Sequence, residues 1–244
     1  MGTVFSFDIR DPATTAIHRA LARAVRGLHE VDEVFSTYRP DSAISRLGRG
    51  ETTVADCPPD VLEVFQLCSK AFRLSEGWFS TVADGTLDPS GLVKGWAAEA
   101  ASRTLWEAGA YNTCVNGGGD IRLRGESSPG TPWRIGIADP LRPGRPAATV
   151  TGRDLAVATS GTAERGGHIL DPYTGAPVTG PYASVTVTGP GLALTDAYAT
   201  AAFAMGEAAP AWLAGLDGYE ALTITTDGRT HTTPGFPGRA DPRC

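Results

Sequence analysis

The chain has few cysteines and no long apolar run, and both absences narrow the classes of protein to which it can belong. Its cysteines are Cys57, Cys68, Cys114 and Cys244, which show no CxxC spacing and are too sparse for a disulfide scaffold. The apolar stretches fall short of the roughly 20 residues that a transmembrane helix needs, so no membrane span is expected. The start of the chain has no basic flank followed by an apolar run, as a signal peptide would have, so we expect the chain as given to be cytoplasmic. Export stays open if the true start lies upstream.

Basic side chains are in the minority. The 244 residues include 21 Lys or Arg and 27 Asp or Glu, so the formal net charge is −6. There is no basic tract or face of the kind that neutralises a row of phosphates, and no nucleic-acid partner is expected. GxGxxG after a strand, GxxxxGKS/T, HExxH and GxSxG are also missing, which excludes the common dinucleotide, P-loop, zincin and hydrolase signatures.

Hydrophobic periodicity predicts three long helices in the first half of the chain. Apolar residues recur every three or four positions from Ile17 to Phe35, and similar patterns run from Val61 to Leu74 and from Lys94 to Ala108. Short segments of strand character follow these helices. They are Thr113–Val115, Ile121–Arg124, Trp133–Ala138, Leu155–Ala158 and Ser184–Thr188.

The C-terminal part adds a predicted hairpin. Ala221–Thr225 and Thr230–Thr233 flank Asp227-Gly228, a strong hairpin turn signal. Early helices followed by many strands predict an α+β protein, with helices on one face of a largely antiparallel sheet. Residues 1–244 are expected to form a single domain or two tightly fused lobes, because no repeat or long linker divides them. Phe236–Cys244 is predicted to be a loose tail.

A further helix is predicted to begin at Thr195 and to be closed by Gly206, and its start carries oxygen-bearing side chains. Thr195 is the predicted N-cap, and Asp196 suits the positive end of the helix dipole. Asp196 and Thr200 stand at i and i+4 on one face, where the pair could hold a hard cation shared with a phosphate-bearing substrate. The alternative is a capped helix with an incidental threonine, and spacing alone favours that alternative.

Four polar segments stand in loops beside strands or at a helix start. Asn116–Asp120 is typical of a hairpin connection, or of glycines that let a ligand approach the backbone. Thr159–Gly161 ends a strand, and His168–Gly175 adds an imidazole and a carboxylate, although a lone histidine is more often structural. Leu87–Gly95 places an acid and one of two lysines at a helix start, where anions bind readily.

Taken together and in this order, these segments resemble the ApbE family of flavin transferases, the FAD:protein FMN transferases. The resemblance spans nearly the whole chain. Each motif is weak by itself, but coincidence is a poor explanation for all of them at plausible spacing. The matching segments are Met1–Thr3, Phe35–Leu47, Val115–Asp120, Ala158–Gly161, His168–Gly175 and Ser184–Val187, followed by Asp196 and Thr200.

The resemblance implies the family's sheet-and-helix fold and a reaction that splits the FAD pyrophosphate. FMN would move onto a threonine or serine hydroxyl of an acceptor flavoprotein, and AMP would be released. Mg²⁺ would be held by the Asp196 carboxylate, the Thr200 side chain and the Gly91 backbone carbonyl. The FAD site would be lined by Met1, Tyr38, Asp88, Lys94 and Ile169. His168 falls beside the reacting phosphate, and an imidazole with a pKa near ~6.5 makes it the hypothesised general base.

Two positions depart from the family pattern. Ser80 stands where relatives usually carry an aspartate, which predicts a different pocket wall between Gly77 and Asp88. Glu99 stands where the pattern after Lys94 ends in aspartate, a change that keeps the charge.

Other functions stay open at this point. With water as acceptor, the same site would make an FAD pyrophosphatase that yields FMN and AMP. A non-catalytic FAD-binding or delivery protein is an alternative of another class, but binding alone would not require Asp196, Thr200 and His168 together. A hydrolase built on Ser160, His168 and Asp171 ranks lowest, because the sequence has no nucleophile elbow.

Overall fold

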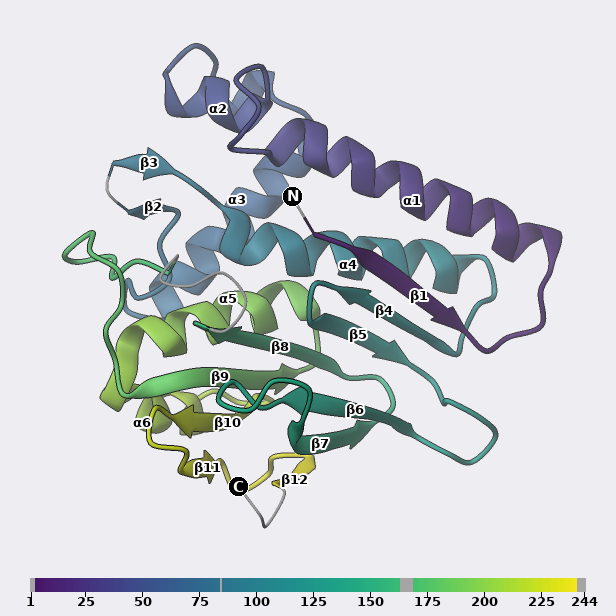
Figure 1. Cartoon of the computed structure of the whole chain (residues 1–244). Coiled ribbons are helices and arrows are strands. Elements are labelled where there is room, and N and C mark those ends of the chain that lie inside the picture. Colours follow the sequence, from purple (N-terminus) through teal and green to yellow (C-terminus); the bar gives the residue numbers. More distant parts are fainter. Residues whose placement is uncertain (1–2, 84, 163–168, 241–244) are drawn as a thin grey trace.

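A seven-stranded sheet forms the centre of the fold (Figure 1). The structure, a computed structural model, describes residues 3–83, 85–162 and 169–240. Every neighbouring pair in this sheet is antiparallel. In spatial order its strands are β1 (Phe5–Ile9), β4 (Thr113–Gly117), β5 (Asp120–Arg124), β8 (Ala156–Gly161), β9 (Tyr182–Gly189), β10 (Glu220–Thr225) and β11 (Thr230–Thr232).

The long helices cover one face of this sheet, and the larger hydrophobic core lies between the two layers (Figure 1). They are α1 (Thr15–Phe35), α3 (Pro59–Leu74), α4 (Ser90–Glu107) and α5 (Leu192–Met205), with shorter helices α2 (Ala43–Gly48), η1 (Val54–Asp56), η2 (Gly206–Ala208) and α6 (Ala209–Ala214). The α+β prediction is therefore confirmed, with helices on one face of an antiparallel sheet. In the described ranges no helix combines the length and apolarity that crossing a membrane requires.

A second, three-stranded sheet covers part of the opposite face and encloses a smaller core. Its strands are β12 (Gly238–Ala240), β7 (Pro146–Gly152) and β6 (Trp133–Ala138), and a separate ribbon pairs β2 (Val82–Ala83) with β3 (Thr86–Leu87). The prediction of a loose tail from residue 236 is wrong up to residue 240, because β12 pairs with β7 and Phe236 is buried in the smaller core. Treating residues 1–244 as one transferase domain stays a prediction.

Helix α5 begins earlier than the sequence suggested. Gly191 occupies the N-cap position, so the prediction of Thr195 as N-cap is wrong. The Thr195 hydroxyl lies inside the helix and donates to the Gly191 carbonyl over 2.7 Å. This shift places Asp196 in the second turn, buried against α4 rather than at an exposed helix end.

Candidate active site

Two glycines let α4 and α5 approach closely. A Cβ atom added to Gly95 would lie 2.6 Å from the Leu192 carbonyl oxygen and 2.8 Å from the Asp196 Cβ. One added to Gly91 would lie 3.3 Å from the Thr200 Oγ1. The absence of side chains on this face of α4 therefore brings its first turns directly against the face of α5 that carries Asp196 and Thr200.

The Asp196 carboxylate is bound to the backbone of α4. It is buried, and its Oδ2 accepts a hydrogen bond from the Gly95 N–H over 2.9 Å. In a regular α-helix that N–H serves the carbonyl four residues earlier, which belongs to Gly91. Because Asp196 competes for this donor, the Gly91 carbonyl is left more available to another positively polarised partner.

Asp120 and Lys94 complete a buried cluster with Asp196. Lys94 Nζ lies 2.7 Å from Asp120 Oδ2, and the side chains are 22% and 1% exposed. The carboxyl groups of Asp120 and Asp196 also lie close enough to share a hydrogen bond when one of them is protonated. Asp120 was missed as an individual site residue, because the sequence alone favoured a hairpin turn for the segment that ends with it.

The electrostatics of this cluster favour an additional cation. Burial raises the pKa of Asp120, while the Lys94 ammonium opposes that rise. Burial and then the neighbouring Asp120 charge raise the pKa of Asp196 well above its ordinary value. Two buried carboxyl groups thus face one ammonium, and a bound divalent cation would offset the unbalanced charge.

The three residues predicted to hold magnesium lie together. Gly91 faces Thr200, and Asp196 lies one turn before Thr200 on α5. Ser160 Oγ, at the end of β8, lies 3.3 Å from Thr200 Oγ1 and adds another hydroxyl. Within the described ranges, no three His, Cys, Asp or Glu side chains gather as a metal-binding group. A carboxylate, a hydroxyl and a carbonyl form an all-oxygen donor set, which fits Mg²⁺ shared with a substrate phosphate.

The residues predicted to line the FAD site do not all lie beside this cluster. Asp88 is exposed, and its Oδ1 accepts from the Ser90 N–H over 2.8 Å at the start of α4. Tyr38 is 92% exposed in the loop before α2. Ile169 packs against the larger core, and its carbonyl accepts from the Val178 N–H. Only Lys94 reaches the buried cluster among the members of this set that the structure describes.

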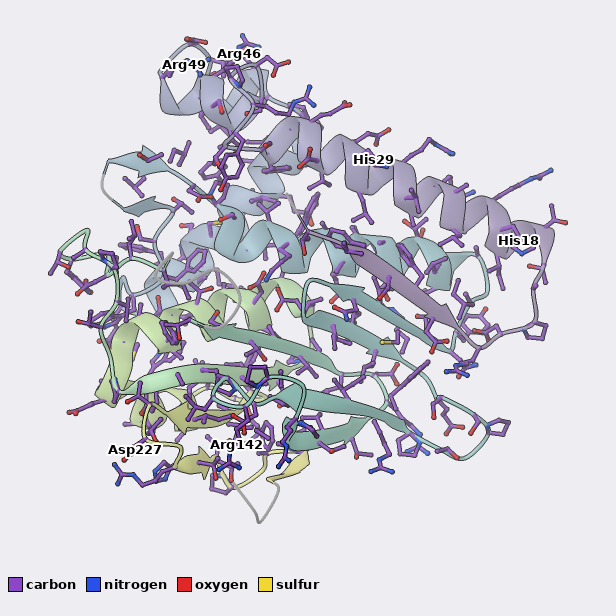
Figure 2. All side chains as sticks on the ribbon, viewed as in Figure 1. His18, His29, Arg46, Arg49, Arg142 and Asp227 are labelled. Carbon is purple, nitrogen blue, oxygen red and sulfur yellow. The ribbon has the colours of Figure 1, made fainter. Side chains whose placement is uncertain are left out.

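The remaining predicted residues, Met1 and His168, lie outside the described residues. The three other histidines of the chain are all exposed. His18 and His29 project from the outer face of α1, away from α5 (Figure 2), and His231 lies on β11 at an edge of the sheet. None of these three is positioned to serve the α4–α5 contact, so His168 stays the candidate base.

An aromatic contact connects the segment after His168 to the end of α3. The Tyr173 hydroxyl donates to the Glu76 carbonyl, and its ring meets Trp78 edge-on with centroids 4.9 Å apart. Asp171 Oδ1 accepts from the Tyr173 N–H over 2.8 Å, which fixes the turn. The turn that begins at Asp171 is thus held by contacts with a distant part of the chain.

Comparisons with known proteins agree with this geometry. The sequence profile of the ApbE family matches residues 1–85 and 80–223. An FAD:protein FMN transferase of Vibrio cholerae is 27% identical over 266 residues, covering 85% of this chain and 80% of that protein. An FAD:protein FMN transferase of Rhodobacter capsulatus is 32% identical over 206 residues, covering 77% of this chain and 39% of that protein.

Solved structures share the fold over almost the whole chain. The flavin transferase ApbE from Vibrio cholerae superposes with a TM-score of 0.81 at 26% identity, covering 97% of this chain and 95% of that one. The ApbE protein of Thermotoga maritima, at 20% identity, gives a TM-score of 0.82 over 96% of this chain and 94% of that one, a likeness of fold. Since the sequence profile, the curated relatives and the architecture agree, the chain belongs to the ApbE family.

Proposed function

We propose that this enzyme is a Mg²⁺-dependent FAD:protein FMN transferase whose acceptor is a threonine or serine hydroxyl. Membership of the ApbE family and the named activity of its relatives support flavin transfer. The metal, the acceptor hydroxyl and the release of AMP are the finer parts of the proposal. The observation that carries it is the pair of buried carboxyl groups, Asp120 and Asp196, that meet one lysine where α4 contacts α5.

Each residue has a defined part in this proposal. Asp196, Thr200 and the Gly91 carbonyl would hold Mg²⁺, which, when bound, neutralises charge on the pyrophosphate oxygens. The Lys94 ammonium would bind and orient the pyrophosphate as a further positive charge. The proposed FAD contacts are Met1, Tyr38, Asp88, Lys94 and Ile169.

The transfer step needs a base for the acceptor hydroxyl. In the proposal, His168 takes the hydroxyl proton while the oxygen forms a bond to the phosphorus of the FMN moiety. The bond from that phosphorus to the bridging oxygen of the pyrophosphate breaks, and AMP leaves with that oxygen. The imidazole must be neutral to accept this proton, so the rate of FMN transfer should fall as the pH is lowered.

The test is incubation of the purified protein with FAD and Mg²⁺, with and without an acceptor domain that carries one target threonine. Acceptor mass and AMP are measured together. A gain of one FMN with one AMP, lost in EDTA, is the expected result. AMP without a labelled acceptor would instead indicate an FAD pyrophosphatase, and FAD binding without AMP would indicate a delivery protein.

Matched variants connect the result to the site. Asp196→Asn should abolish labelling. Asp227 is an exposed aspartate at the β10–β11 turn (Figure 2), and Asp227→Asn should leave labelling unchanged. An acceptor with valine in place of its threonine should gain no mass. Labelling of that valine acceptor would contradict transfer to the hydroxyl.

A further inference from the structure

We propose that Asp120 is a positioning residue that holds Lys94 and Asp196 in a fixed relation before FAD and Mg²⁺ bind. The inference rests on the proposed function, in which Lys94 contacts FAD and Asp196 binds the metal. Asp120 touches neither substrate nor metal in this proposal. It acts through its two neighbours.

The contacts of Asp120 leave its carboxyl group little freedom. Oδ2 lies 2.7 Å from Lys94 Nζ, and Oδ1 accepts a long hydrogen bond of 3.4 Å from the Thr159 N–H. The same carboxyl group contacts that of Asp196, and the residue is 0% exposed. One side chain of β5 therefore connects α4, β8 and α5.

The backbone that carries Asp120 is equally constrained. Gly118 and Gly119 form the turn between β4 and β5, both with positive φ, and Asn116 Oδ1 accepts from the Gly119 N–H over 2.9 Å. A Cβ atom on Gly117 would lie 2.5 Å from the Phe5 ring, so β1 packs directly against the start of this turn. The Asp120 carboxyl group therefore reaches α4 from a hairpin that is held by its own contacts.

Burying a carboxylate costs free energy unless it is paired with a positive charge. We therefore take the ion pair with Lys94 to be the role of Asp120. Lys94 has a flexible four-carbon stem whose rotamer freedom is lost when it binds a ligand. Held by Asp120, the stem is already ordered, while its 22% exposed side chain still reaches solvent. Preordering of this kind strengthens ligand binding because less freedom is lost in the complex.

The test is a double-mutant cycle on FAD affinity, measured by titration of flavin fluorescence in EDTA and again with Mg²⁺. Asp120→Asn keeps the shape of the side chain and removes its charge. We expect it to weaken FAD binding by about 10-fold, the lower part of the range for residues that orient direct ligands. In a Lys94→Met background the same change should have an effect of less than about 2-fold, because the residue through which Asp120 acts is gone.

Metal affinity gives a second readout that a merely structural residue would not change. With Asp120 neutral, Lys94 would pair with Asp196 instead and compete with the cation, so Mn²⁺ binding followed by its EPR signal should weaken by about 10-fold. Glu99→Gln is the matched control: it lies on α4 outside the site and should lower thermal stability while leaving both affinities within about 2-fold. If Asp120→Asn does not fold, Asp120→Ser supports the same cycle.

The outcomes separate this inference from the proposed function. Equal losses of FAD affinity in the wild-type and Lys94→Met backgrounds would overturn the positioning role, as would wild-type affinities in Asp120→Asn. Either result could occur while the wild type still labels its acceptor, so the transfer proposal would stand. A wild type that neither binds FAD nor labels an acceptor would overturn both.

Discussion

Two partly buried ionic clusters lie along the same three elements, α4, β5 and α5, and they differ in the sign of the charge that is in excess. Near the start of α4, the carboxyl groups of Asp120 and Asp196 face the single ammonium of Lys94. Further along, Glu99 Oε1 lies 3.0 Å from Arg122 Nε and 3.1 Å from Arg124. Glu99 Oε2 also accepts from the backbone N–H of Leu192, the first residue of α5, over 2.8 Å.

The second cluster has an excess of guanidinium groups. Arg124 Nε donates to Ser102 Oγ over 2.8 Å, and the charges of Asp154 and Arg103 also act on Arg124. Three guanidinium groups thus meet the charges of two carboxylates. The first cluster instead has an excess of carboxyl groups. Because only an excess of carboxyl groups favours a bound cation, we expect the first cluster to bind ligands and the second to stabilise the fold.

Removing Asp196 should have the largest effect of the changes considered. Asp196→Asn is expected to lower the rate of FMN transfer about a thousandfold, or about 4 kcal/mol, because a metal on the pyrophosphate supplies stabilisation of that order. Its free energy of unfolding should not fall, since one of two adjoining buried carboxyl groups becomes neutral. The measurement is acceptor mass against time, with urea unfolding on the same preparation; a wild-type rate at saturating FAD and Mg²⁺ would remove Asp196 from the site.

Breaking the second cluster should have the opposite signature. Glu99→Gln leaves Arg122, whose side chain is 7% exposed, without its carboxylate, and should lower the free energy of unfolding by about 3 kcal/mol. The transfer rate per folded molecule should stay within about 3-fold. Glu51→Gln is the control, because Glu51 pairs with exposed Arg49 on the outside of the molecule (Figure 2) and its urea midpoint should not move. A large loss of rate with normal stability would reverse the assignment of the two clusters.

The close approach of α4 to α5 is required by both clusters. Gly95→Ala places a methyl group within 2.6 Å of the Leu192 carbonyl oxygen, and we expect a loss of about 2 kcal/mol in unfolding free energy together with slower transfer. Gly27→Ala, in the middle of α1 with no atom within 4 Å of the added methyl, should instead stabilise by about 0.5–1 kcal/mol. Equal effects of the two substitutions in thermal unfolding would contradict the tight contact.

The gain in unfolding free energy when the metal binds should be the smallest of these effects. With FAD present and Mg²⁺ at ten times its dissociation constant, the wild type is expected to gain about 1.4 kcal/mol in unfolding free energy. Glu99→Gln should show the same gain from its lower baseline, and Asp196→Asn should show none. A gain that persists in Asp196→Asn would place the cation elsewhere.

Features encoded locally were predictable from the sequence. The long helices and the β10–β11 hairpin follow from hydrophobic period and turn residues, and Asp196 and Thr200 share a face because they are four residues apart. The strand Pro146–Gly152 was missed because its small residues resemble a loop, and the packing of the second sheet, to which it belongs, against the first leaves no local pattern.

Contacts made across the sheet could not be predicted in the same way. The ion pair between Lys94 and Asp120 depends on how β5 lies against α4, which the spacing of the two residues does not determine. The predicted N-cap of α5 was wrong because the Thr195 hydroxyl donates to the Gly191 carbonyl inside the helix. The roles of Met1 and His168 rest on the family resemblance and stay predictions.

The most direct test of the account compares acceptor labelling by the wild type, Asp196→Asn and Glu99→Gln under identical FAD and Mg²⁺, with rates corrected for the folded fraction of each protein. We expect one FMN per acceptor for the wild type and for Glu99→Gln, and no detectable labelling for Asp196→Asn. Labelling by Asp196→Asn at the wild-type rate, or its loss in folded Glu99→Gln, would contradict the division between a ligand-binding and a structural cluster.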